Sequence, residues 1–379
     1  MLARFVPARH KQPVGFSREL RTGIDFRIPA HCVHRQSIMQ DDHPIRRSSW
    51  VTRRSFIGST AAACSALLLT DTVGANTANS TAQFHENQWL RLRDGRLLGF
   101  ATYGDPSAWP VLYFHGIPTS RIEARHYAAA AMRHGCQLIA IDRPGIGVSS
   151  FQCGRTIVHW LNDVLEFIDS PALPANLHLG QFSIATFSSG AAYTLLCAAR
   201  LPQDRVRSVA VVSGIAPLEQ LHRYGGQAQK FFNLAARRPN MARVAYNFSS
   251  RRINRRPHQM LRMASRFFSR SDARIFNDPR TNRVLIDSYG QCVRQGPAGV
   301  IHDMSLLSRP WGFSLREVNR KVSLWYGACD ITTPANSMGE CLNRTLPNSH
   351  LNVFAGEGHL SMYDSVNDQI FGQLVADIG

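Results

Sequence analysis

The sequence of 379 residues has only three lysines, no long apolar run and no cysteine pair with metal-binding spacing. A helix that crosses a bilayer needs about 18 consecutive apolar residues. The longest candidate, residues 57–70, is shorter and is interrupted by glycine, serine and threonine. Without C-x-x-C spacing, a zinc site is not expected among the cysteines. We therefore expect a globular protein with no metal centre and no stable membrane insertion of the mature chain.

Positive charge is concentrated in two parts of the chain. The net charge is +17, and arginine carries nearly all of the positive charge. Residues 218–316 hold 18 Lys+Arg against 5 Asp+Glu, and residues 1–75 hold 11 against 5. The remainder is nearly neutral, so the basic character belongs to an N-terminal segment and one internal segment.

An arginine pair near the N-terminus begins a segment typical of protein export. Residues 52–57 read T-R-R-S-F-I, a weakly apolar stretch covers 61–69, and V-G-A follows at 73–75. This order resembles a twin-arginine signal peptide. We predict a signal peptide over 39–75, after an uncertain or mis-called extension over 1–38. The predicted location is the periplasm or the outside of a bacterial cell, with the twin-arginine machinery as partner. The alternative interpretation is a buried helix with an incidental arginine pair.

Six cysteines follow the predicted signal peptide. An oxidising compartment outside the cytoplasm permits disulfide bonds. Cys329 and Cys341 are the pair to test first, because a loop at a strand end and the helix after it could bring them together. The alternative is that the cysteines are small buried hydrophobic residues.

From residue 87 onward, short apolar runs alternate with segments of helical periodicity. This alternation predicts an α/β fold with a mostly parallel sheet that has helices on both faces. Between residues 216 and 312 no convincing strand occurs, and apolar residues recur at helical spacing. We therefore predict a core over 87–215 and 313–379, with a helical cap over 216–312 inserted between core strands.

The sequence I-A-T-F-S-S-G at residues 184–190 contains a candidate nucleophile. A serine in a nucleophile elbow occupies a tight strand-to-helix turn, so the residues two before and two after it must be small. Ser188 has Thr186 and Gly190 at these places, whereas Ser189 would have a phenylalanine. We predict Ser188 as the nucleophile of an atypical elbow, in which threonine stands at the place of the first glycine.

Donors for an oxyanion are expected in the loop after the strand that ends at Phe114. This loop reads H-G-I-P, and its glycine lets the main chain approach a substrate. We assign the donors to the N–H groups of Ile117 and Ser189, the second aided by the N-terminal end of its helix. His115 is interpreted as a support of the loop, because it lies too close to the donors to act as the base.

A histidine in a glycine-bearing loop is the candidate base. Residues 356–359 read G-E-G-H and follow the last predicted strand, which predicts His359 as the general base. The alternative is a helix-capping or solvated loop histidine. Asp330 follows the preceding strand, and we expect it to accept a hydrogen bond from the Nδ1–H of His359 and hold the reactive tautomer.

Five features in this order resemble the α/β-hydrolase superfamily over residues 87–379. They are F-H-G at 114–116, D-R-P-G-I-G-V-S at 142–149, the elbow, G-A-C-D at 327–330 and G-E-G-H at 356–359. The resemblance implies the chain order Ser, Asp, His and a serine nucleophile, as in the esterase-like and proline-iminopeptidase-like branch. Asp142 is interpreted as structural, because dehalogenases and epoxide hydrolases carry their nucleophilic aspartate in the elbow.

We expect hydrolysis of an ester or related acyl substrate, a small molecule, through an acyl-enzyme on Ser188 and without a cofactor. Amide hydrolysis, carbon–carbon bond hydrolysis and cofactor-free haloperoxidase chemistry use the same triad, and the sequence does not separate them. An alternative from another class is a non-catalytic exported binding protein on a hydrolase scaffold, which the unusual Thr186 suggests.

The arginine-rich segment has two open interpretations. Its arginine pairs at 251–252 and 255–256 are four residues apart, which is typical of a solvated helix face. The alternative is attraction of anionic substrates or surfaces. Nucleic acid is not an expected partner, because basic and aromatic residues do not interleave. Four aromatic residues of the cap are expected to line or cover the pocket: Phe231, Phe232, Tyr246 and Phe248.

Overall fold

The computed structural model describes residues 83–174, 177 and 179–378. The predicted signal peptide and the extension before it lie outside the described residues. Among the described residues, no helix has both the length and the apolar character needed to cross a bilayer.

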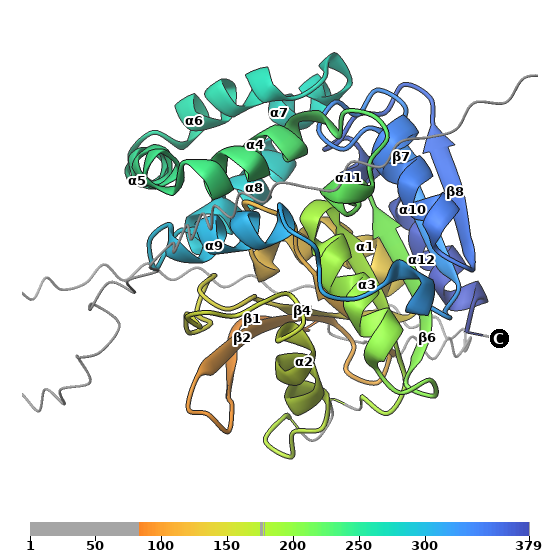
Figure 1. Ribbon diagram of the computed structural model, residues 1–379. Helices are drawn as coiled ribbons and strands as arrows, with labels where there is room; N and C mark the ends of the chain where they lie inside the picture. Colours follow the sequence, from red (N-terminus) through yellow and green to blue (C-terminus); the bar gives the residue numbers. More distant parts are fainter. Residues whose placement is uncertain (1–82, 175–176, 178, 379) are drawn as a thin grey trace, which may run out of the picture. The chain divides into compact units, whose positions relative to one another are not determined.

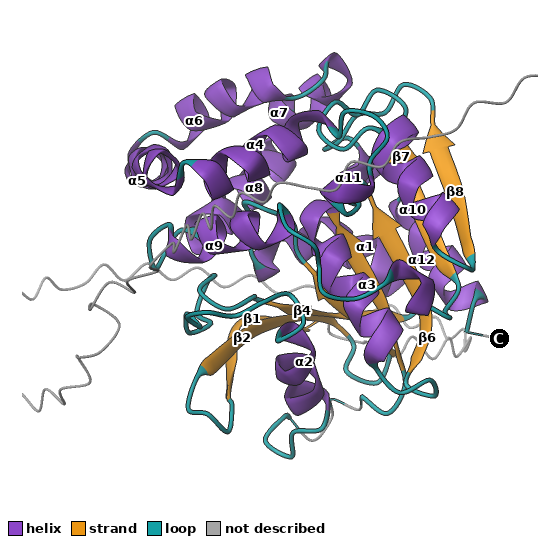
Figure 2. Cartoon of the chain, viewed as in Figure 1, coloured by secondary structure: helices purple, strands orange, loops and turns teal. Residues whose placement is uncertain are grey.

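One mixed sheet of eight strands forms the centre of the described chain (Figure 2). Its strands are β1 (Gln83–Arg91), β2 (Leu97–Gly104), β3 (Trp109–Phe114), β4 (Cys136–Ile141), β5 (Phe182–Phe187), β6 (Val206–Val212), β7 (Val322–Gly327) and β8 (Ser349–Phe354). Their order across the sheet is β1-β2-β4-β3-β5-β6-β7-β8. The pairs β1–β2 and β2–β4 are antiparallel, and the other five pairs are parallel. The predicted mostly parallel sheet is therefore confirmed.

Helices cover both faces of the sheet, and successive strand residues alternate between the two faces. On β3, Leu112 and Phe114 pack in one apolar cluster, while Val111 and Tyr113 pack in the other. The first cluster includes residues of α2 (Trp160–Ile168), α3 (Ala191–Arg200) and α10 (Glu340–Thr345). The second includes α1 (Arg125–Arg133), α11 (Met362–Ser365) and α12 (Asn367–Ala376). Burial of both faces explains why the central strands are continuous apolar runs in the sequence.

Six helices lie between β6 and β7, where the sequence predicted a helical cap. They are α4 (Gly226–Arg237), α5 (Pro239–Arg255), α6 (Pro257–Ala264), α7 (Ala273–Asn277), α8 (Pro279–Cys292) and α9 (Ala298–Leu307). Three of them begin with proline at the first turn, where its missing N–H costs no hydrogen bond. The helices lie over the carboxyl ends of the parallel strands (Figure 1). The loops that leave β3, β5, β7 and β8 therefore emerge beneath the cap.

Cys329 and Cys341 are both free cysteines. The pairing of Cys329 with Cys341 that we would have tested first is therefore not formed. Cys329 is exposed, whereas Cys341 is buried. The Cys341 thiol contacts the carbonyl oxygen of Gln220 at 3.7 Å, because α10 turns this side chain toward the segment that leads into the cap.

Candidate active site

Ser188 lies at the junction of β5 and the helical turn that leads into α3. Its φ of 54° is in the left-handed region, which residues other than glycine rarely adopt. Ser188 lines a cavity beneath the cap, whereas Ser189 does not. The Ser189 hydroxyl is buried without a hydrogen-bond partner. The strained turn therefore directs the side chain of Ser188, and not that of its neighbour, toward the cavity.

The threonine that makes the elbow sequence atypical is accommodated by its neighbours. Thr186 Oγ1 donates a hydrogen bond to the carbonyl oxygen of Phe114 at 2.6 Å. A Cβ atom on Gly190 would lie 2.1 Å from that hydroxyl and 2.3 Å from the same carbonyl oxygen. Glycine is therefore required at 190, and the space that it leaves is what allows threonine at 186.

His359 and Asp330 form a buried pair. The Nδ1–H of His359 donates to Oδ2 of Asp330 at 2.8 Å. The other carboxylate oxygen accepts the backbone N–H groups of Thr332 at 2.7 Å and Thr333 at 2.8 Å. The loop after β7 thus holds the carboxylate, and the carboxylate holds the imidazole in the tautomer whose Nε2 is an acceptor.

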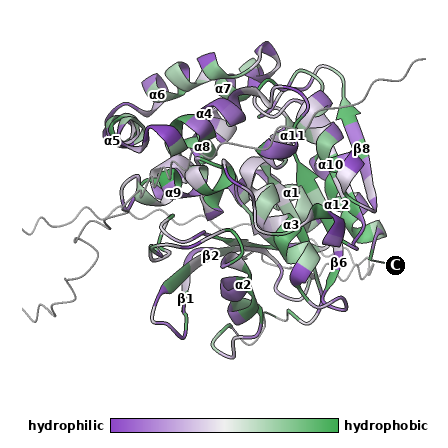
Figure 3. Cartoon of the chain, in the orientation of Figure 1, coloured by the Kyte–Doolittle hydropathy of each residue, from purple (hydrophilic) through white to green (hydrophobic). Residues whose placement is uncertain are grey.

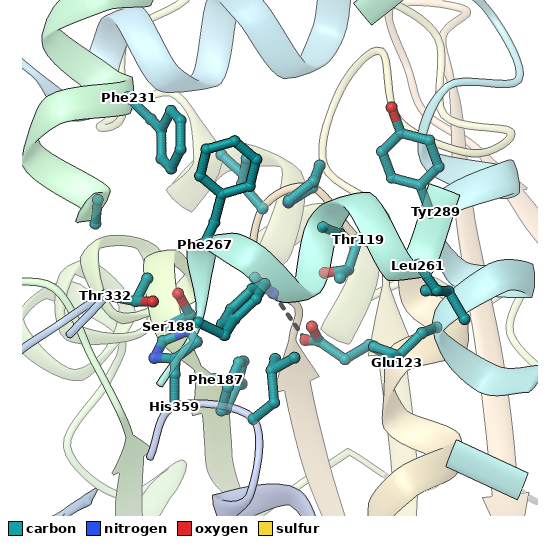
Figure 4. A pocket seen from close by; sticks show the side chains of 18 of the residues that line it. Thr119, Glu123, Phe187, Ser188, Phe231, Leu261, Phe267, Tyr289, Thr332 and His359 are labelled. Atoms are coloured by element: carbon teal, nitrogen blue, oxygen red, sulfur yellow. Dashed lines mark hydrogen bonds between the residues drawn. The ribbon is translucent and has the colours of Figure 1, made fainter. Parts of the chain in front are cut away.

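The surroundings of His359 favour its protonated form. Burial lowers the pKa of His359, but the attraction and hydrogen bond of Asp330 outweigh that effect. The carboxylates of Asp272 and Glu123 add to the attraction, so the pKa lies above its usual range. Figure 4 shows the imidazole beside Ser188 in the cavity. No hydrogen bond joins the two side chains among the described residues, and such bonds commonly tighten only when substrate binds.

The loop after β3 is held from both sides at Gly116. The N–H of Gly116 donates to Glu123 at 2.8 Å. Its carbonyl oxygen accepts from Arg143 Nη2 at 2.9 Å and from His115 Nδ1 at 2.8 Å. The N–H of Ile117 belongs to the same planar peptide as this carbonyl and points the opposite way. The loop lies against the elbow, since a Cβ on Gly116 would be 3.3 Å from Cβ of Ser188.

His115 acts on the loop and does not face the cavity. It is fully buried, and burial together with the charge of Arg143 holds its pKa well below the usual range. A neutral imidazole with its proton on Nδ1 can donate to Gly116 and accept on Nε2 from the N–H of Arg143 at 3.4 Å. These contacts make His115 a support of the loop after β3.

A buried cluster of charges ties the cap to this loop. Arg143 also donates to the carbonyl oxygen of His115 at 2.5 Å, and its Nε donates to Asp303 of α9 at 2.6 Å. Asp303 in turn pairs with Arg155 and accepts from the hydroxyl of Tyr193 at 3.0 Å. Arg143 and Asp303 are wholly inaccessible to solvent. A single cap carboxylate therefore neutralises two buried guanidinium groups, one of which holds the loop after β3.

Asp142 lies outside the cavity lining, as expected of a structural residue. Its carboxylate accepts from the N–H of Arg121 at 2.7 Å and forms a fully buried ion pair with the same residue at 2.6 Å. A Cβ on Gly147 would lie 1.9 Å from this carboxylate, so the turn requires glycine there. The turn that carries Asp142 and Arg143 is therefore fixed by buried polar contacts.

The cavity has a volume of about 300 Å³ and is lined mainly by apolar and aromatic side chains (Figure 4). Loops of the core and helices of the cap both contribute. Phe231, Phe232 and Tyr246 line it, as predicted. Phe248 does not: its side chain is 52% exposed on the outer side of α5, so that prediction is wrong. Helical spacing alone does not distinguish the inner from the outer side of a cap helix.

Two buried carboxylates near the site were missed from the sequence. Glu123 lines the cavity and accepts hydrogen bonds from the hydroxyls of Tyr113 and Tyr363, each at 2.8 Å. Burial raises the pKa of Glu123. Asp272 of the cap accepts the backbone N–H of His359 at 3.3 Å. The S-x-x-D pattern at 269–272, a capping box, was the available signal for Asp272.

No cluster of three or more His, Cys, Asp or Glu side chains suited to a metal ion occurs among the described residues.

A family model described as alpha/beta hydrolase fold matches residues 110–366. No curated protein sequence matches the chain. Among solved structures, a bromoperoxidase from Bacillus anthracis is 16% identical with a TM-score of 0.57, covering 76% of this chain and 99% of that one. A thermophilic esterase from Thermogutta terrifontis is 20% identical with a TM-score of 0.56, and the match covers 79% of this chain and 100% of the esterase. The epoxide hydrolase CorEH is 16% identical with a TM-score of 0.57, and the match covers 77% of this chain and 98% of the epoxide hydrolase. At these identities the likeness shows the fold.

Proposed function

The chain belongs to the alpha/beta hydrolase fold family, and we propose that it is an exported serine hydrolase that cleaves an ester or related acyl bond. The observation that carries the proposal is one cavity lined by both Ser188 and His359, with Asp330 bonded to Nδ1 of the histidine at 2.8 Å. A serine hydroxyl becomes a nucleophile when a base of fixed orientation can take its proton.

In the proposed reaction, Ser188 Oγ attacks the acyl carbonyl carbon while Nε2 of His359 accepts the serine proton. The N–H groups of Ile117 and Ser189 bind the oxyanion of the tetrahedral intermediate. His359 then donates its proton to the leaving alcohol, and an acyl-enzyme remains on the serine. Water that is deprotonated by the same histidine releases the acid. Asp330 stabilises the imidazolium in both steps, and the scheme uses no cofactor.

Ser188 and its neighbour provide a direct test with a matched control. A fluorophosphonate probe should label the wild-type chain and fail to label Ser188→Ala. Ser189→Ala should remain labelled, because only the backbone N–H of Ser189 takes part in the scheme. Undiminished labelling of Ser188→Ala would rule out the assigned nucleophile. A folded wild-type chain that is not labelled would favour a non-catalytic binding protein.

The bond that is cleaved is tested by substrate profiling. The apolar lining of the cavity favours an apolar acyl or alcohol group. A panel of p-nitrophenyl esters of increasing acyl length, compared with anilides and with a bromination assay, separates ester hydrolysis from the amide and haloperoxidase alternatives. Turnover of anilides alone would replace the ester proposal with amide hydrolysis.

Export through the twin-arginine machinery is the second part of the proposal and rests on the sequence of residues 52–75. Replacing Arg53 and Arg54 by lysine should retain the precursor in the cytoplasm of a bacterial host, since the pair is the recognised element. Fractionation followed by immunoblotting measures the distribution. Equal export of both forms would contradict this route.

A further inference from the structure

A long stretch of the cap carries positive charge without any acidic residue. No Asp or Glu occurs from residue 220 to residue 271. Nine of the ten arginines between residues 237 and 270 are exposed, Arg252 being the exception. None of the nine takes part in an ion pair within the described part of the chain, although exposed arginines elsewhere do, such as Arg133 with Asp368. The positive charge of this surface is therefore not compensated by ion pairs with the residues that the structure describes.

The same surface exposes apolar side chains. Half of the exposed large hydrophobic residues in the described ranges lie between residues 224 and 267. Met241, Val244 and Phe248 of α5 are exposed by 61%, 70% and 52%. Their spacing of three and four residues places them in one stripe along the helix. Arg251 and Arg255 continue that stripe by the same spacing, so apolar and cationic groups share one outer face.

Helix α5 is apolar on two sides, which distinguishes it from an ordinary solvated helix. Tyr246 and Ile253 of α5 line the cavity from the inner side, as do Met260 and Leu261 of α6. A helix that covers a core needs only one apolar stripe, and its outer side is normally polar. Figure 3 shows hydrophobic and hydrophilic residues mixed along α6. Within the part of the chain that the structure describes, the second apolar stripe on α5 therefore has no partner.

One aromatic residue of the cavity lining is also exposed on the outer surface of the cap. Phe267 lines the cavity and is also 49% exposed. Its ring lies 5.6 Å from that of Phe231, which lines the cavity as well. Figure 4 shows both rings on the cap side of Ser188 and His359. An apolar molecule that reaches the outer surface near Phe267 would thus meet apolar side chains on its way to the serine.

We propose that the outer face of α4, α5 and α6 docks on an anionic phospholipid surface. The exposed arginines pair with the negative headgroups, and Met241, Val244 and Phe248 enter the boundary between headgroups and acyl chains. Charge complementarity selects an anionic partner, and the aliphatic stripe selects lipid over nucleic acid, because Met241 and Val244 offer no stacking surface for bases. Docking brings the Phe267 entrance toward the lipid, and delivery of an apolar ester from the membrane to Ser188 rests on the proposed function.

Vesicle sedimentation with the purified full chain tests the docking. The chain should bind vesicles that contain phosphatidylglycerol more tightly than pure phosphatidylcholine vesicles, and raising NaCl from 0.1 to 0.5 M should weaken binding. Arg251→Gln with Arg255→Gln should reduce partitioning roughly 30-fold, about fivefold for each arginine. Arg93→Gln with Arg316→Gln removes the same charge from exposed sites outside the cap and should have little effect.

A second pair of variants separates the apolar contribution and the competing partner. Met241→Ser with Val244→Ser keeps the charge and should weaken vesicle binding but not binding to duplex DNA. Equal binding to both vesicle types, or equal loss in the two arginine pairs, would overturn the proposal. Tighter binding to DNA than to anionic vesicles at equal salt would reassign the face to nucleic acid. Ser188→Ala should bind vesicles like wild type, so a failed labelling test and a failed docking test are distinguishable.

Discussion

Asp303 provides a quantitative test of the buried charge cluster. It lies between the guanidinium groups of Arg143 and Arg155 with no solvent exposure. Asp303→Asn keeps the shape of the side chain but leaves two buried positive charges without a counter-charge. Removal of one partner from a buried ion pair typically costs about 3–5 kcal/mol. Thermal unfolding should therefore occur roughly 6–20 °C lower, at about 2–4 °C for each kcal/mol.

The assay is thermal unfolding followed by circular dichroism, with Asp368→Asn as the matched control. Asp368 pairs with Arg133 at 2.8 Å, but both side chains are more than half exposed. Solvent screens such a pair, so the control should unfold at nearly the wild-type temperature. Asp303→Asn should also slow fluorophosphonate labelling, because Arg143 holds the carbonyl of Gly116. If both variants unfolded at the same temperature, the charge cluster would not stabilise the fold as argued.

The dependence on pH follows from the pKa of Asp303. Burial alone would raise this pKa, but the attraction of Arg155 and Arg143 outweighs burial and holds it well below the usual range. A carboxyl group with a lowered pKa stabilises the fold at pH values above its unfolded pKa, about 4, and loses this effect as pH falls through the folded pKa. The difference between wild type and Asp303→Asn should be constant from pH 5 to 8 and shrink in stronger acid.

Two further predictions concern the elbow and the base. Gly190→Ala should abolish fluorophosphonate labelling and destabilise the fold by about 1–3 kcal/mol, because the added Cβ would lie 2.1 Å from Thr186 Oγ1. Gly290→Ala is its control, since nothing lies within 4 Å of a Cβ at that position. Equal behaviour of the two variants would contradict the steric argument. On the acid side of the pH profile, kcat/KM should reach half of its maximum at a pH above about 6.5. The reason is that Asp330 raises the pKa of His359 and that only neutral imidazole accepts a proton. Asp330→Asn should move that midpoint to lower pH and reduce kcat at least a thousandfold, and an unshifted midpoint would show that another group titrates.

The local pattern of the sequence determined the strands, the tight turns and the candidate site residues of this protein. Buried strands need continuous apolar runs, and tight turns need small residues at set distances, so strands, turns and the candidates Ser188, Asp330 and His359 could be predicted from short segments. The chain order of these candidates and their places after strand ends follow from the same segments. Ile117 and Ser189 were predicted in the same way, since each lies in the turn that follows a strand.

Tertiary packing decided what depends on residues distant in the sequence. Arg143 contacts Asp303 across 160 positions, and Tyr363 contacts Glu123 across 240. No local pattern therefore predicts that these groups hold the loop after β3 and line the cavity. The outward position of Phe248 and the free state of Cys341 likewise depend on how helices rotate against their neighbours. Thr186 is acceptable because β3 offers the carbonyl of Phe114 to its hydroxyl and because Gly190 leaves the space. That contact joins residues 72 positions apart, which is why only the folded chain shows how threonine is accommodated at this position.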